Sequence, residues 1–354
     1  MLMSSLGALF YRTGEIKMII VLKPHAPEDK LQELIREIEG IGLRVDLSRG
    51  AEQTILGLIG DTHSVNEVRF EKNEIVAKVM RVQEPYKKVN RLFKPDGTVV
   101  KVAGHEIGGK KLAIIAGPCS VESEEQIISV ARDVQRAGAG FLRGGAFKPR
   151  TSPYSFQGLG EEGLDMLITA KKETGMPIVS EIMDANVLGK FVENVDIIQV
   201  GARNMQNYSL LKELGKLKKP ILLKKGFAST IEEWLMAAEY VMSGGNENII
   251  LCERGMRTFE TFTRNTMDMC AVPVVKRLSH LPVISDPSHG TGISWLVEPA
   301  AKASISLGAD GLMIEVHNCP DEALCDGNQA LTPEQFESLM KKLSPLAELE
   351  GRGI

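Results

Sequence analysis

Hydrophobic residues along most of this chain recur in short runs, and these runs alternate with longer stretches whose apolar positions lie three or four residues apart. Short continuous runs predict buried strands, and the wider spacing predicts amphipathic helices. From residue 112 onward the alternation occurs eight times. The expected strands are 112–116, 141–144, 178–181, 197–200, 221–224, 249–252, 283–286 and 311–316, with helices such as 124–137, 161–174, 230–242, 298–307 and 332–346 between and after them.

Eight βα units over about 240 residues predict an α/β fold, the (β/α)8 or TIM barrel, over residues 98–350. A doubly wound parallel sheet would give the same alternation. The barrel is favoured because every cluster of polar residues follows the carboxyl end of a strand, and those ends share one face of a barrel.

Residues 18–84 carry a different pattern. Strand-like runs at 19–22, 43–47, 54–59 and 75–82 enclose helical stretches after Pro27 and at 64–70. The order βαββαβ predicts a small ferredoxin-like domain. We expect residues 85–97 to be a linker. We expect residues 1–17 to be a disordered leader or an upstream start, because they lack the basic start and small-residue cleavage site of a signal peptide.

Composition narrows the class of protein. The chain has 354 residues, a net charge of −4 and 43% hydrophobic residues, which is normal for a soluble globular protein and gives no support for bulk nucleic-acid binding. No apolar run is long enough to span a bilayer. Five scattered cysteines do not form a disulfide framework, so we expect a cytoplasmic protein.

Four metal-type ligands follow three strands that are consecutive around a closed barrel. Cys119 follows the first strand, His289 follows the seventh, Glu315 ends the eighth, and Asp326 lies in the loop beyond. One thiolate, one imidazole and two carboxylates suit one divalent transition metal ion, such as Mn, Fe or Zn, without fixing which. His317 shares a strand face with Glu315 by the period of two, so we expect it to support the ligands. A lone Cys at such a position is often only a small core residue.

Cationic residues also gather at strand ends, beside glycines that let the backbone approach a ligand. Arginine makes bidentate contacts to phosphate and carboxylate groups. Six cations exceed the need of one phosphate and predict two anionic, phosphorylated substrates. The alternative is a structural ion-pair network with Glu181 and Glu253. The set consists of Arg143, Lys148, Arg150, Arg203, Lys224 and Arg254.

These motifs, taken together over about residues 112–346, resemble 3-deoxy-D-arabino-heptulosonate 7-phosphate (DAHP) synthase, the first enzyme of the shikimate pathway. The N-terminal βαββαβ segment resembles the regulatory extension of its type I beta branch. The resemblance rests on the segments Gly117-Pro118-Cys119-Ser120, Leu142-Arg143-Gly144-Gly145, Lys148-Pro149-Arg150-Thr151-Ser152, Gly201-Ala202-Arg203-Asn204 and Asp286-Pro287-Ser288-His289.

The resemblance implies a transferase that condenses phosphoenolpyruvate with erythrose 4-phosphate and water, releasing phosphate. It implies a metal held by Cys119, His289, Glu315 and Asp326. It implies that phosphoenolpyruvate binds Arg143, Lys148, Arg203, Lys224 and Arg254, and that erythrose 4-phosphate binds Arg150 and Thr151. As hypotheses, Lys148 donates a proton to the new alkoxide, Glu181 orients the water, and His317 assists.

Two alternatives stay open at this point. A 3-deoxy-D-manno-octulosonate 8-phosphate synthase would use arabinose 5-phosphate, although Pro149-Arg150-Thr151 favours the four-carbon sugar. A barrel without activity would serve only for binding. From the resemblance we expect Phe or Tyr as effectors and a homo-oligomer, with a tetramer expected. Whether Cys119 forms a disulfide with Cys325 after metal loss depends on a distance that sequence does not give.

Overall fold

The computed structural model describes residues 16–49, 54–60, 62, 65–81, 85–150 and 152–354. The chain forms two compact units that divide between Pro95 and Asp96, inside the segment expected to be a linker. Thr151, residues 50–53 and most of the expected leader lie outside the described residues. Each unit is described by itself.

The N-terminal unit has the predicted ferredoxin-like architecture. Its elements are β1 (Ile16–Leu22), α2 (Glu28–Gly40), β2 (Arg44–Arg49), β3 (Thr54–Ile59), α3 (Glu67–Glu71) and β4 (Val76–Arg81). The strands form one antiparallel sheet in the order β2-β3-β1-β4. β1 begins at Ile16, two residues inside the expected leader, because Ile16 pairs with Ile59 before the ladder shifts register.

Alternation along β1 gives this sheet two apolar faces. Met18, Ile20 and Leu22 belong to the core that includes Leu31 and Leu34 of α2. The intervening β1 residues belong to a second apolar cluster with residues of β3. Successive side chains of a strand point to opposite faces, so one short strand contributes to both clusters.

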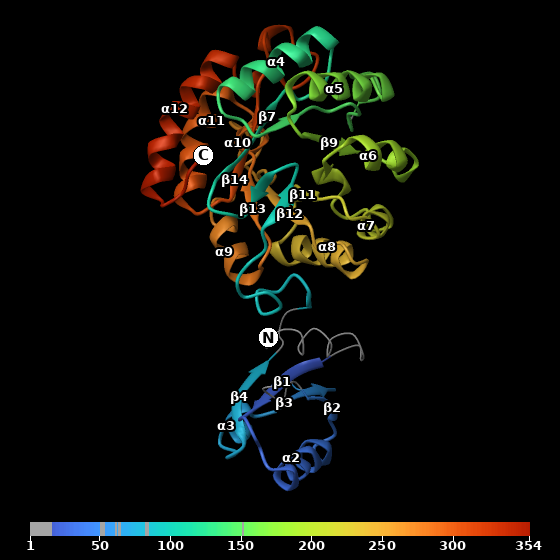
Figure 1. The fold of residues 1–354 in the computed structure, drawn as a ribbon, viewed down its shortest axis with the longest axis vertical. Helices are drawn as coiled ribbons and strands as arrows, with labels where there is room; N and C mark the ends of the chain where they lie inside the picture. Colours follow the sequence, from blue (N-terminus) through green and yellow to red (C-terminus); the bar gives the residue numbers. More distant parts are fainter. Residues whose placement is uncertain (1–15, 50–53, 61, 63–64, 82–84, 151) are drawn as a thin grey trace. The chain divides into compact units, whose positions relative to one another are not determined.

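The second unit is a closed parallel barrel, as predicted, and not an open doubly wound sheet. Its strands run in the cyclic order β10-β11-β12-β13-β14-β7-β8-β9, with helices surrounding them (Figure 1). The strands are β7 (Ala113–Gly117), β8 (Phe141–Arg143), β9 (Ile178–Ile182), β10 (Ile197–Val200), β11 (Ile221–Lys224), β12 (Ile249–Glu253), β13 (Val283–Ser285) and β14 (Gly311–Glu315).

The helices follow the strands that they cover. They are α4 (Glu124–Arg136), α5 (Glu161–Thr174), α6 (Leu188–Asn194), α7 (Tyr208–Gly215), α8 (Ile231–Ser243), α9 (Ala271–Leu278), α10 (Pro287–Thr291), α11 (Ser294–Ser306) and α12 (Pro333–Leu349). α8 and α12 begin with capping boxes at Thr230 and Thr332, each closed by a Glu or Gln three residues later.

The barrel interior is apolar at its amino-terminal end. Each strand contributes residues to one buried cluster, among them Phe141, Leu222 and Met313. Val100 and Ile107 join this cluster from the hairpin of β5 (Val100–Val102) and β6 (His105–Ile107). Apolar side chains therefore fill the interior from this end, and polar side chains lie at the carboxyl ends of the strands.

The barrel unit includes residues beyond the predicted boundary at 350. Arg352 NH1 lies 3.2 Å from Asp310 Oδ1 and donates to the Ala309 carbonyl at 2.9 Å. Gly353 forms a parallel bridge with Lys111. Among the described helices, none is both long and apolar enough for a bilayer-spanning segment.

Candidate metal and anion site

The period of two along the strands places polar side chains directly above the apolar interior. Phe141 and Met313 face the core, and the residues two positions later are Arg143 and Glu315. Leu222 is likewise followed by Lys224. Because alternate residues of a strand share a face, each of these polar groups points into the barrel at its carboxyl end.

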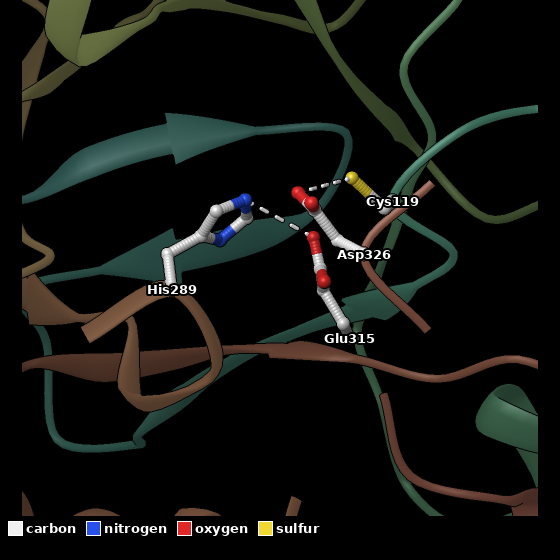
Figure 2. A group of neighbouring side chains, drawn as sticks. All are labelled: Cys119, His289, Glu315 and Asp326. Atoms are coloured by element: carbon white, nitrogen blue, oxygen red, sulfur yellow. Dashed lines mark hydrogen bonds and ion pairs between the residues drawn. The ribbon is translucent and has the colours of Figure 1, made fainter. Parts of the chain in front are cut away.

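The four expected metal ligands meet at this end of the barrel. Potential donor atoms of Cys119, His289, Glu315 and Asp326 all lie within 4.8 Å of one another. Figure 2 shows the four side chains converging from separate segments, with Cys119 Sγ 3.3 Å from Asp326 Oδ2 and His289 Nε2 3.1 Å from Glu315 Oε1. Cys119 and Glu315 are buried.

Local backbone structure positions these donors. Gly117 precedes Cys119 with φ +148°, and a Cβ there would meet the Arg143 carbonyl oxygen at 2.2 Å, so only glycine lets the chain turn this close to β8. His289 lies on the short helix α10, whose N-cap Asp286 accepts from the His289 amide at 3.0 Å. Asp326 has a left-handed backbone, φ +56°.

The protonation states suit a cation. Burial lowers the pKa of His289, which favours the neutral imidazole that a metal requires. Burial opposes ionisation of Glu315, but His289 and Arg143 lower its pKa below the ordinary value. The pKa of Cys119 is raised by its hydrogen bond to Cys325 and by burial. A divalent ion is the charge that makes a coordinating thiolate favourable in such surroundings.

One buried carboxylate oxygen of the cluster has charged neighbours but no hydrogen bond. Glu315 Oε1 is buried and has no hydrogen-bond partner among the described residues, although His289 Nε2 and Arg143 NH1 lie near it. An unsatisfied buried carboxylate oxygen is costly. This donor set, with S, N and O ligands, therefore fits a divalent transition metal.

A cavity of about 280 Å³ adjoins His289 and Asp326. Arg203 and Arg254 line it, and within the described part of the chain neither forms an ion pair with a carboxylate. Their guanidinium carbons instead lie 5.2 and 4.5 Å from the centre of the Phe227 ring, and Arg257 lies 4.8 Å from it. Arg254 is buried with NH1 unpaired. This side of the cavity therefore has free positive charge.

The other predicted cations in the cavity already have partners. Lys224 Nζ lies 2.6 Å from Asp286 Oδ2. Lys148 Nζ donates to the Cys119 carbonyl at 2.9 Å and to its Sγ at 3.0 Å. Burial opposes the charge of Lys148, but the neighbouring Cys119 raises its pKa above the ordinary value, so the ammonium persists. Arg150 NH1 donates to Cys325 Sγ at 2.7 Å.

Three predicted residues lie differently from expectation, or outside the described part. Arg143 does not line the cavity, and its NH1 faces Glu315 Oε1 at 3.0 Å. His317 is also absent from the lining: its Nε2 lies 3.4 Å from Glu122 Oε2, and its Nδ1 accepts from the Cys319 amide. β14 ends at Glu315, so the alternation used to place His317 does not continue to it. Thr151 lies outside the described residues.

Glu181, predicted to orient a water, does line the cavity and accepts from Gln199 Nε2 at 2.9 Å. It packs closely below Gly201, because a Cβ added there would lie 1.9 Å from Glu181 Oε1. Neither Glu181 nor Glu253 forms an ion pair within the described segments. The alternative in which these two carboxylates neutralise the cations is therefore not supported.

Sequence reasoning assigned no role to four residues of this region. Arg264 lies in the long segment after β12, far from any strand end, and no motif in that segment indicates a functional residue. Asp286 precedes a proline at the end of β13, which is the pattern of a helix N-cap and was a usable signal. Phe227 and Gln329 are ordinary loop residues whose contacts arise only in the fold.

The comparisons with known proteins agree with this geometry. A model of the DAHP synthetase I family matches residues 97–349, and a model of the DAHP synthase ferredoxin-like domain matches residues 18–84. The barrel and the small domain thus each match a family model.

Individual relatives point the same way. A phospho-2-dehydro-3-deoxyheptonate aldolase of Thermotoga maritima is 48% identical over 94% of this chain and 99% of its own length. A crystal structure of the Thermotoga maritima DAHP synthase superposes with a TM-score of 0.77 at 47% identity, covering 96% of this chain and 99% of that one. A 2-dehydro-3-deoxyphosphooctonate aldolase of Geobacter sulfurreducens is 32% identical over 70% of this chain and 97% of its own.

Proposed function

The chain belongs to the DAHP synthetase I family and is a metal-dependent transferase that condenses phosphoenolpyruvate with erythrose 4-phosphate and water to give DAHP and phosphate; we propose that it does so in the cavity at the carboxyl end of its barrel. The observation that supports this placement most strongly is the pairing of two unlike features. Four metal-type donors lie on one side of the cavity, and two arginines without carboxylate partners lie on the other.

Cys119, His289, Glu315 and Asp326 would hold one divalent transition metal ion. When bound, such an ion supplies Lewis acidity to an aldehyde oxygen. Its identity is not determined by the donor set, since Mn, Fe and Zn all accept these ligands.

Arg203 and Arg254 would bind the phosphate and carboxylate groups of phosphoenolpyruvate, with Lys148 and Lys224 beside them. A guanidinium with free N–H groups can make bidentate bonds to either anion. Arg143 would act on the site through Glu315, consistent with their 3.0 Å contact. Arg150, with Thr151, would bind erythrose 4-phosphate. Holding two anions in fixed positions removes much of the entropic cost of joining them.

The reaction then needs a proton donor and a water. C3 of phosphoenolpyruvate forms a bond to the aldehyde carbon, and the aldehyde oxygen takes a proton. We propose Lys148 as the donor, because it is a buried ammonium at the cavity wall. Water adds at C2, and phosphate leaves with cleavage of its bond to that carbon. Glu181 would accept the proton of that water, since its carboxylate lines the same cavity.

A substrate panel tests this function. Purified protein is supplied with phosphoenolpyruvate and either erythrose 4-phosphate or arabinose 5-phosphate, with and without a chelator, and the deoxy-keto acid product is assayed. We expect product from erythrose 4-phosphate and its loss with chelator. Comparable kcat/KM with arabinose 5-phosphate would favour the octulosonate synthase, and no product from either sugar would favour a binding role.

We also propose that residues 18–84 form a regulatory domain that binds an aromatic amino acid, Phe or Tyr, in a cytoplasmic homo-oligomer, with a tetramer expected. The residues of this domain that the structure describes contribute no donor to the metal cluster and none to the cavity lining. Inhibition by each amino acid, measured as rate against concentration, tests the effector, and light scattering tests the oligomer.

A further inference from the structure

Gln329 connects two of the four metal-type donors through hydrogen bonds. Its Nε2 donates to Glu315 Oε2 at 2.7 Å. Its Oε1 accepts from Arg264 NH1 at 3.0 Å, and the same NH1 lies 3.2 Å from Asp326 Oδ2. Gln329 is 2% exposed, so these bonds form away from bulk water.

The chemistry of its two partners suits an amide at this position. An ionised carboxylate only accepts hydrogen bonds, and a guanidinium only donates them. A bridging group must therefore donate on one side and accept on the other. The partners also fix which way the amide of Gln329 faces, because the reverse orientation would place like groups together.

The two oxygens of Glu315 consequently differ. Oε2 is held by Gln329, whereas Oε1 lacks a hydrogen bond and lies 3.0 Å from Arg143 Nη1 and 3.1 Å from His289 Nε2. The last torsion of a Glu side chain has no strong intrinsic preference, so its orientation must come from its surroundings. The bond from Gln329 to Oε2 and the ion pair of Oε1 with Arg143 supply that orientation together, and Oε1 faces the other donors.

Gln329 also secures the loop that carries Asp326. Its backbone N–H donates to the Asp326 carbonyl at 3.2 Å within the short turn Gly327–Gln329. Asp326 itself has φ +56°, a conformation that non-glycine residues adopt only when their surroundings impose it. Gln329 thus ties a donor on a strand to a donor on a loop.

We propose that Gln329 is a positioning residue that holds Glu315 and Asp326 in their metal-binding arrangement, with Arg264 as the link to the substrate cavity. The proposal rests on the function proposed above, since it takes the four donors as a metal site. Partners that orient metal ligands typically change metal affinity about 10- to 100-fold when they are removed.

The test uses Gln329→Met, which keeps the length of the side chain and removes both hydrogen bonds. Full-length protein is stripped of metal, and the Kd for Mn²⁺ is measured by competition with a fluorescent chelator. Gln335→Met is the matched control, because Gln335 is an exposed capping residue of α12. The melting temperature of the metal-free protein is measured for every variant.

We expect the Kd of Gln329→Met to rise about 10- to 100-fold, with the metal-free melting temperature unchanged and kcat recovering at saturating Mn²⁺. The control should match wild type in its Kd for Mn²⁺, although losing the capping box of α12 is expected to lower its melting temperature. Should the Met variant not fold, Gln329→Asn keeps the amide but shortens its reach, and the same rise in Kd is expected.

Three results would overturn the inference. An unchanged Kd for the Gln329 variants would leave Gln329 without a role at the metal. A lower metal-free melting temperature with unchanged Kd would make its role structural only. Wild-type protein that binds no Mn²⁺, Zn²⁺ or Fe²⁺ would remove the metal site itself, and with it the proposed function.

Discussion

Replacing Arg203 with alanine gives the sharpest test of the anion-binding side of the cavity. Arg203 lines the cavity, has no carboxylate partner within the described residues and is held over the Phe227 ring. The substitution therefore removes a cation without leaving a buried carboxylate unpaired. We expect the KM for phosphoenolpyruvate to rise, with kcat and the KM for erythrose 4-phosphate little changed, because the lost contact binds ground state and transition state alike.

The magnitude follows from the exposure of Arg203. A hydrogen bond to a charged group contributes about 1.5–3 kcal/mol, and about 1.4 kcal/mol corresponds to a tenfold change. Arg203 is exposed at the cavity edge, where water weakens such bonds, so a rise of about 10- to 30-fold is expected. Arg254 is only 2% exposed, and Arg254→Ala should raise KM further.

The assay is the steady-state rate of phosphoenolpyruvate consumption followed by its ultraviolet absorbance. Arg277→Ala, on the exposed side of α9, is the matched control and should leave KM unchanged. An unchanged KM in Arg203→Ala, or an equal rise in the control, would refute the assignment of Arg203 to the substrate.

The remaining predictions concern other parts of the two units. Cys119→Ser should sharply lower metal content and activity. Because the sulfurs of Cys119 and Cys325 lie 3.3 Å apart, air oxidation of metal-stripped enzyme should cause a loss of activity that dithiothreitol reverses and Cys325→Ser slows. Mass spectrometry that finds no disulfide between Cys119 and Cys325 would contradict this pairing. Burial raises the pKa of Glu253 to about 7, so folding favours its protonated form and the free energy of unfolding should fall as pH rises from about 4.3 to 7. Denaturant titrations should show this dependence on pH in wild type and not in Glu253→Gln, and an identical dependence in both would count against the prediction. Phe227→Leu should raise the KM for phosphoenolpyruvate several-fold while Phe227→Tyr should not, because only an aromatic ring attracts the guanidinium groups. Equal KM values for the two variants would show that the ring only fills space. A truncation starting near Val89 should keep activity and lose inhibition by aromatic amino acids, and a folded but inactive product would argue against a regulatory role for the removed domain.

Much of the fold could be predicted from sequence because each strand has a continuous apolar run and turns separate the runs. The expected strand 221–224 agrees with β11 to the residue, and 197–200 agrees with β10. The four metal-type donors could be proposed for the same reason, since each follows a strand end and strand ends converge in a barrel. Short helices such as α10 were not predicted, because five residues give too little periodicity.

The rest of the site depends on contacts that sequence spacing does not encode. His317 was placed by extending the alternation of β14 past its end. Arg264 reaches the site from a long segment without regular spacing and pairs with Asp326, more than sixty residues away in the sequence. Arg143 follows the predicted strand register, yet it faces Glu315 and not the cavity, because the Glu315 carboxylate is an opposite charge only 3.0 Å away.

We propose that residues from four separate segments form one metal site on which the reaction depends. The most direct measurement is a titration of metal-stripped protein with a single divalent metal, following bound metal and DAHP formation in the same samples. We expect activity to rise in proportion to bound metal and to reach its maximum at one ion per chain, and we expect Cys119→Ser to lose both metal binding and activity. Full activity in protein shown to be free of metal, or one-to-one binding that persists unchanged in Cys119→Ser, would contradict it.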